Sequence, residues 1–318
     1  PDGLDERTGL ANEILELART TGDREMELVG RARRAAGAIE AGDIGAAEAD
    51  IAAHAELAEQ LRMPYHLSSA ASMRAMRALL QGSPGRAEQL AEEALALLPA
   101  RLDAIYTHLN QVTQVRWDQG RLGELRATWQ EGVDRFPQAS FARGWLCLSE
   151  VELDRREDAH RWLRSLVDAF PDLPRNGIWP SALAVASVAA AALEDEDAAA
   201  SVHRLLLPYA DRVTVLSAPH PVVCLGSVSL YIALAETAMA RWEEADKHFG
   251  AAIRANTRLG ARSLEARTQL GYARMLIRRG RARDRPHVLD LLDRAATTAT
   301  ALGTDALVNE AERLRELE

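Results

Sequence analysis

The stretch 239-MARWEEADKHFGAAIRANTRLGAR-262 contains a turn signal followed by one amphipathic helical pattern. Trp242, Ala245, Phe249 and Ala252 recur at the spacing of a single helix face. A small residue such as Ala245 at the start of the helix lets a preceding antiparallel helix cross closely. The stretch therefore predicts the second helix of a helical hairpin, with Trp242 assigned to hairpin packing rather than to a binding site.

The same turn signal recurs along the chain between helical patterns. The residue that begins each second helix is, in order, Ala47, Ala87, Leu125, Ala159, Ala199 and Ala245, with successive spacings of 40, 38, 34, 40 and 46 residues. Helical hairpins at this period are the signature of an α-solenoid. Leu125 breaks this small-residue rule.

These patterns predict an all-α protein, a right-handed α-solenoid of about seven antiparallel helix hairpins. The scarcity of β-branched runs and the 5% aromatic content agree with helix throughout. The expected units are residues 24–63, 64–103, 104–138, 139–175, 176–217, 218–260 and 261–318. Residues 1–23 are expected to be the second helix of a truncated hairpin, which indicates a piece of a longer protein.

Charge and composition narrow the function classes. The formal net charge is −9, which argues against nucleic acid as a partner, although Arg254 to Arg294 holds eleven Arg against four acids. No run reaches the ~18 apolar residues that span a bilayer, so no membrane association is expected. Cys147 and Cys224 lie far apart without metal-ligand spacing, which favours a reducing, cytoplasmic setting.

The phrases "GDIGAAEADIAAHAELAEQL" and "RWEEADKHFGAAIRANTRLGA", with their five-residue Gly-to-Ala turn spacing, resemble the tetratricopeptide repeat (TPR). The long units and the ending from Arg258 resemble one branch of it, the degenerate repeats at the C-terminal end of LuxR-type and MalT-like bacterial regulators and of class III adenylate cyclases with an AAA/STAND ATPase module. The chain departs from the strict TPR pattern at Glu236, where a Tyr is often seen.

The resemblance implies a non-enzymatic sensor or scaffold region of a bacterial multidomain signalling protein, with a transcriptional regulator favoured. Its partners would be a protein, a peptide, neighbouring domains of the parent chain or a small molecule, bound on the concave face. Two alternatives stay open, a free-standing peptide-binding adaptor and the helical arm of a cyclase.

Catalytic and metal-binding patterns are not evident, and we expect no enzyme activity, metal or cofactor. The eight His residues are scattered without an HExxH motif, and no GxxxxGK[ST] phosphate loop occurs. In "HPVVC", His220 and Cys224 stand four apart, but Pro221 prevents a continuous helix through them. A buried Cys and a loop His are the expected interpretation.

Two sets of polar residues are candidate binding surfaces. Asn110, Gln114 and Trp117 lie opposite the apolar stripe of their helix, and Ser227 and Tyr231 share a spacing of four further along; together they are expected to line the concave groove. The second set is a basic rail near the C-terminus, able to hold carboxylate or phosphate. It comprises Arg262, Arg267, Arg274 and Arg278, with Tyr272 nearby.

Overall fold

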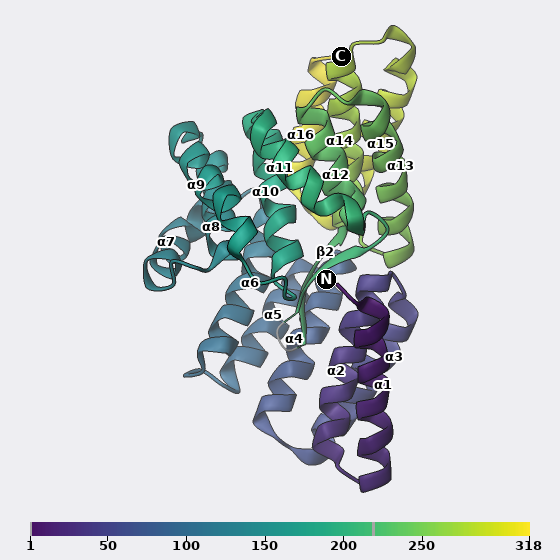
Figure 1. The fold of residues 1–318 in the computed structure, drawn as a ribbon. Coiled ribbons are helices and arrows are strands. Elements are labelled where there is room, and N and C mark those ends of the chain that lie inside the picture. Colours follow the sequence, from purple (N-terminus) through teal and green to yellow (C-terminus); the bar gives the residue numbers. More distant parts are fainter. Residues whose placement is uncertain (1, 218–219) are drawn as a thin grey trace.

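The computed structural model describes residues 2–217 and 220–318. Within these residues, seven consecutive helix pairs run along the chain (Figure 1), with α1 (Leu4–Thr21) before them and α16 (Asp305–Glu316) after them. The pairs are α2 (Arg24–Ala41) with α3 (Ile44–Leu61), α4 (Pro64–Leu80) with α5 (Pro84–Ala96), α6 (Leu102–Gln119) with α7 (Arg126–Arg135), α8 (Ser140–Glu152) with α9 (Arg156–Ala169), α10 (Trp179–Leu193) with α11 (Glu196–Leu206), α12 (Val228–Ala238) with α13 (Trp242–Leu259), and α14 (Arg262–Arg279) with α15 (Arg285–Leu302). The predicted all-α solenoid class is confirmed.

Helix α13 shows how local sequence sets each hairpin. It begins at Trp242 and ends at Leu259. The next residue, Gly260, has a φ of 64° that suits a residue without a side chain, and its N–H caps carbonyls of the last turn. Ala245, Phe249 and Ala252 are fully buried, whereas Trp242 is half-buried against the same core. The stripe that predicted the helix is therefore its packing face.

The hairpin that contains Leu125 differs from the others. Where the neighbouring units begin a second α-helix, this unit forms a 3₁₀ turn over Leu122–Leu125, and α7 starts only at Arg126. The indole Nε1 of Trp129 donates to Thr113 Oγ1 of α6 over 3.1 Å, which joins the two helices of this unit. The bulkier Leu125 thus coincides with a shortened second helix.

A two-stranded antiparallel hairpin interrupts the helices, and the sequence analysis did not predict it. Its strands are β1 (Val213–Ser217) and β2 (Pro221–Ser227), which occupy the expected boundary between units 176–217 and 218–260. The run "RVTVLS" and the run "PVVCLGS" are rich in β-branched residues, which favour strands. Pro221 begins β2, a position where the missing N–H is tolerated.

The β-hairpin fills the inside of the curved array. Val213, Val215 and Cys224 pack in one core cluster with residues of α2, α3, α4 and α14, whereas Leu216 and Val222 join the main core of the later repeats. Figure 1 shows β2 where the N-terminal helices (purple to blue) meet the C-terminal ones (green to yellow). The chain itself therefore covers the inner face that an open solenoid would present to a partner.

The last helices also contact the second and third helix pairs. Helix α4 contacts α14, and α6 contacts α16. The approach is close at Gly120, because a Cβ there would lie 2.8 Å from the Ala306 side chain. The described repeats thus form a closed arrangement around the β-hairpin rather than an open arc.

Candidate ligand-binding cavity

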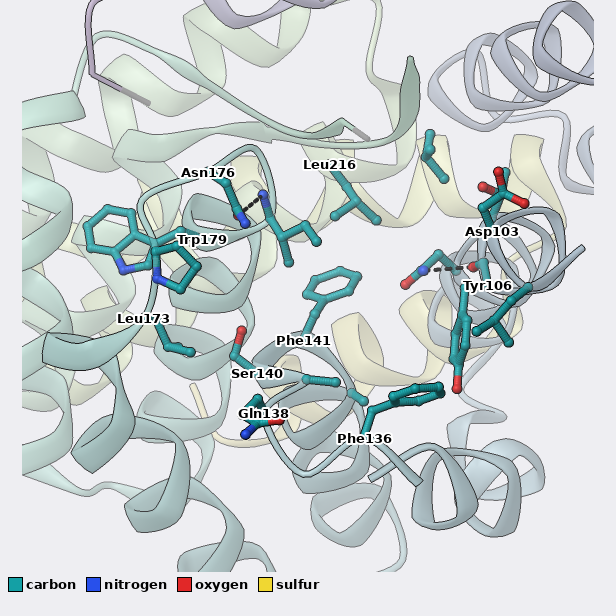
Figure 2. A pocket seen from close by; sticks show the side chains of 18 of the residues that line it. Asp103, Tyr106, Phe136, Gln138, Ser140, Phe141, Leu173, Asn176, Trp179 and Leu216 are labelled. Carbon is teal, nitrogen blue, oxygen red and sulfur yellow. Dashed lines mark hydrogen bonds between the residues drawn. The ribbon is translucent and has the colours of Figure 1, made fainter. Parts of the chain in front are cut away.

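A cavity of about 440 Å³ opens between α6, α8 and the segment that leads into α10. Figure 2 shows Phe141 at its centre with Leu216 opposite, Tyr106 and Phe136 on one side, and Trp179 on the other. The rings of Tyr106 and Phe136 meet edge to face, with centroids 5.9 Å apart. Pockets of roughly 300–1,000 Å³ with apolar and aromatic walls are the usual form of small-molecule sites.

Two buried polar atoms at this cavity lack partners among the described residues. Asn110 is 91% buried; its Nδ2 donates to the Tyr106 carbonyl over 2.7 Å, and its Oδ1 has no partner. The indole Nε1 of Trp179 is also buried without an acceptor. A buried polar group without a partner costs about 1–3 kcal/mol, so the Oδ1 of Asn110 favours a bound molecule that donates a hydrogen bond.

Among the described residues, no basic side chain lines this cavity, and the one acid that does, Asp103, is already paired. Both carboxylate oxygens of Asp103 accept from Arg101, at 3.0 and 2.8 Å. The hydrogen bond from Arg101 lowers the pKa of Asp103. The cavity lining therefore carries no net charge, because the Asp103 carboxylate is paired with Arg101.

Among the residues expected to form a groove, Gln114, Ser227 and Tyr231 are buried instead. The Gln114 amide donates to the Cys224 carbonyl over 3.2 Å, and the Tyr231 hydroxyl donates to the Leu225 carbonyl over 2.5 Å. The expectation that these side chains face an open surface is corrected, because the β-hairpin occupies that surface and uses them to satisfy its backbone. Ser227 belongs to the hairpin itself.

The other two groove candidates lie apart from that set. Asn110 lines the cavity. Trp117 is half-buried, meets Trp145 edge to face at 5.7 Å, and is covered by the Arg267 guanidinium 3.9 Å from its ring centroid. The structure thus brings Asn110 to a ligand-sized space and places Trp117 in a contact between distant helices.

The basic rail is largely paired within the chain. Arg267 donates to Asp118 Oδ1 over 3.0 Å and to the Trp117 carbonyl over 2.6 Å. Arg274 pairs with Glu310 at 2.5 Å and Arg278 with Glu194 at 3.6 Å.

The remaining members of the rail do not form one surface with these arginines. Tyr272 is buried and donates to Asp246 over 2.8 Å, while Arg262 is exposed. These side chains therefore do not form one continuous arginine surface.

Five of the eight histidines, scattered in the sequence, gather into two groups. His203 and His248 both contact the buried carboxylate of Glu236, at 3.1 and 2.7 Å. Burial raises the pKa of Glu236, but its hydrogen bonds to these two histidines outweigh burial and lower that pKa overall. Glu236, which departs from the repeat pattern in sequence, thus has a structural role as a buried bridge between α11, α12 and α13.

The second group comprises His54, His66 and His220, all buried. His54 and His66 have ring centroids 5.9 Å apart, and His220 Nε2 lies 3.2 Å from Ser72 Oγ. Within the described chain, no group of three or more His, Cys, Asp or Glu is arranged to hold a metal ion. Burial raises the pKa of Cys147 to about 12 and that of Cys224 to about 11, so both thiols stay protonated at neutral pH.

Mild acid is expected to destabilise the protein through two of these histidines. Burial, followed by the charges of His66, His220 and Arg31, lowers the pKa of His54 from 6.5 to about 3. Burial lowers the pKa of His220 to about 4 despite the opposing charge of Asp103. Their neutral forms stabilise the fold fully above pH 6.5, and this contribution is lost as the pH falls toward 4 and 3. At pH 5 the loss should be about 2 kcal/mol for each histidine.

Urea denaturation at pH 7 and pH 5 measures this loss. His54→Gln should reduce the difference between the two pH values by about half. An unchanged difference in that variant would show that His54 does not carry the effect.

A second cavity, of about 590 Å³, lies between α1, α2 and the start of the β-hairpin. Its lining includes four arginines, Arg7, Arg33, Arg175 and Arg212. Arg7 and Arg212 both pair with Glu40, at 2.8 and 3.0 Å, and Arg175 lies 3.5 Å from Asp2. This cavity is charged, in contrast to the apolar one beside α6.

The aromatic residues of the first cavity were not found from the sequence. Trp179 stands in "IWPSALAVASVAAAAL", which reads as a buried helix, and Phe141 begins another. Phe136 and Leu173 precede or follow prolines at the ends of units. The sequence signal for the cavity is the presence of large apolar residues at unit boundaries. This signal does not single out a cavity, because such residues more often fill gaps between hairpins.

Comparisons with known proteins give no close relative. No protein-family model and no curated protein matches the chain. Among solved structures, the chain is similar to yeast Tom70, with 11% sequence identity and a TM-score of 0.32, over 98% of this chain and 85% of that chain. It is also similar to the P58(IPK) TPR domain, with 13% identity and a TM-score of 0.25, over 98% of each chain. TM-scores this low do not establish a shared fold, so the architecture rests on the helix pairs themselves.

None of the described helices combines the length and apolar content needed to cross a bilayer.

Proposed function

We propose that this chain is a non-enzymatic sensor region built from helical repeats, which binds a small molecule in the cavity between α6, α8 and α10. One observation carries the proposal: a space of about 440 Å³ with aromatic walls lies beside a buried, unpartnered amide oxygen of Asn110. A well-packed core leaves few voids larger than a water molecule. A space of this size with an unsatisfied acceptor is typical of a ligand site.

The wider context is proposed from the sequence resemblance. The chain would be the sensor or scaffold region of a bacterial multidomain signalling protein, with a transcriptional regulator favoured, acting in the cytoplasm on neighbouring domains or a protein partner. The closed inner face disfavours the alternative of an adaptor that binds extended peptides in an open groove, since the β-hairpin lies there. The cyclase-arm alternative differs only in the output domain and predicts the same cavity.

The β-hairpin links the cavity to the core between the earlier and the later repeats. Leu216 and Val222 line the cavity, while Val213 and Val215 pack among the N-terminal and C-terminal helices. A ligand that fits one hairpin position better than another would shift the population of the two. Such a shift would change how the second and third helix pairs contact the last helices.

A neutral fluorescent probe, N-phenyl-1-naphthylamine, tests the cavity. Binding with one-to-one stoichiometry and increased fluorescence is expected, because the probe is small enough for the space and its emission rises in apolar surroundings. Ala139 lines the cavity and is only partly buried. Ala139→Phe should fill part of the space and weaken probe binding by at least about tenfold.

Ala301→Phe is the matched control, because it adds the same ring at an exposed position of α15 outside the cavity. It should bind the probe like the parent protein. The circular dichroism and melting temperature of both variants report whether they remain folded. Equal binding by the parent and a folded Ala139→Phe protein would place the probe elsewhere and contradict the proposed site.

A further inference from the structure

We infer that the cavity beside α6 selects a neutral, aromatic molecule that carries a hydroxyl or N–H donor directed at Asn110. This inference rests on the proposed function, namely that the cavity binds a small molecule. It goes further by naming the ligand class, which follows from three properties of the wall: the fixed amide, the absence of basic side chains, and the ring-rich surface.

The orientation of the Asn110 amide sets the requirement for a donor. Asn110 Nδ2 donates to the carbonyl of Tyr106, one turn earlier in α6, over 2.7 Å. Only the amide nitrogen can donate to a carbonyl, so this bond fixes Oδ1 as the group left without a partner. An acceptor buried in this way is satisfied only by a donor, which a ligand hydroxyl or N–H supplies.

The charge of the lining excludes an anionic ligand. In the described part of the chain, no Arg, Lys or His lines the cavity, so a carboxylate or phosphate would be desolvated there without a counter-charge. A cationic ligand gains little either, because Arg101 already binds both oxygens of Asp103. The arginine-lined cavity beside α1 shows the contrasting chemistry within the same chain.

The shape of the lining favours an aromatic body. Five aromatic side chains contribute to the wall, namely Tyr106, Trp129, Phe136, Phe141 and Trp179. Aromatic rings meet one another favourably edge to face or offset-stacked. A flat ring system can therefore contact several of these side chains at once.

Three naphthalenes with the same ring system isolate these requirements. 1-Naphthol carries an O–H donor, 1-methoxynaphthalene keeps the oxygen but lacks the donor, and 1-naphthoate is an anion. Binding is measured by isothermal titration calorimetry and by competition against N-phenyl-1-naphthylamine. The parent protein should bind 1-naphthol about tenfold more tightly than 1-methoxynaphthalene and 1-naphthoate most weakly.

Asn110→Leu should abolish the preference for 1-naphthol while 1-methoxynaphthalene still binds, which also shows that the cavity remains folded. Asn309→Leu is the matched control, because it makes the same change at an exposed position of α16 outside the cavity. This control should keep the preference of the parent protein.

The contrary results distinguish failure of the ligand class from failure of the proposed function. Equal affinity for 1-naphthol and 1-methoxynaphthalene, or tighter binding of 1-naphthoate, would overturn the ligand class and leave the cavity as a binding site. A preference for 1-naphthol that survives Asn110→Leu would also overturn the role of this amide. Failure of all three naphthalenes and of the fluorescent probe to bind would overturn the proposed function together with the ligand class.

Discussion

Phe249→Ala is expected to lower the free energy of unfolding by about 4 kcal/mol, in the range for truncating a buried Phe. Phe249 is fully buried in the stretch that defines the repeat, and its ring stacks on Tyr272 with centroids 5.2 Å apart. Gly271 lies so close that an added Cβ would be 3.1 Å from the Phe249 ring. The substitution therefore leaves a cavity at the contact of α13 with α14 that the neighbouring backbone cannot readily fill.

Trp242→Ala, seven residues earlier on the same helix face, is the comparison for this prediction. Its side chain is half-buried, so its truncation should cost only about 1–2 kcal/mol. Chemical denaturation of both variants measures the two costs. Equal destabilisation by Trp242→Ala and Phe249→Ala would contradict this prediction, because it would show that Trp242 contributes as much to the packing as Phe249.

Arg267→Met is expected to lower the free energy of unfolding by about 3 kcal/mol, because it leaves the buried Asp118 carboxylate without its partner. The Arg267 side chain is 15% exposed and that of Asp118 is 9% exposed, so water replaces little of the lost interaction. The substitution also removes the hydrogen bond to the Trp117 carbonyl and the contact with the Trp117 ring. Hydrogen exchange should rise in α6 and α14 together, since this contact joins them.

Arg278→Met is the matched control, because it removes the same charge from the same helix at an exposed position. Its nearest acid, Glu194, is 3.6 Å away and its own side chain is 32% exposed. The expected change is about 0.5 kcal/mol or less. Similar losses of unfolding free energy in the two variants would contradict an internal role for Arg267. They would instead support its place on the exposed basic rail that the sequence predicts.

Much of the fold could be predicted from the sequence, because the residues that specify each hairpin lie close together in the chain. The stripe of Trp242, Ala245 and Phe249 and the turn at Gly260 lie within one hairpin, so helical period and turn chemistry suffice to place them. The departure at Leu125 was also visible, since its effect is confined to one turn. The β-hairpin was missed because a model of successive helix pairs has no place for two short strands between them.

The candidate site could be predicted only in part from the sequence. Asn110 was singled out for its position opposite an apolar stripe, and it does line the cavity. Gln114 and Tyr231 followed the same reasoning but are buried against β2. A polar residue on the inner face of a repeat has the same sequence pattern whether it meets a ligand or the protein's own backbone.

The repeated helical hairpins follow from the sequence pattern, because apolar residues at a period of 3.6 and small residues after each turn act within about forty residues. The role of the inner face depends instead on contacts between distant segments, which appear only in the folded chain. Gln114 meets Cys224 across 110 positions, and Arg267 meets Trp117 across 150. Such pairings follow from the closure of the array around its β-hairpin, and they leave the aromatic cavity beside Asn110 as the space for a ligand.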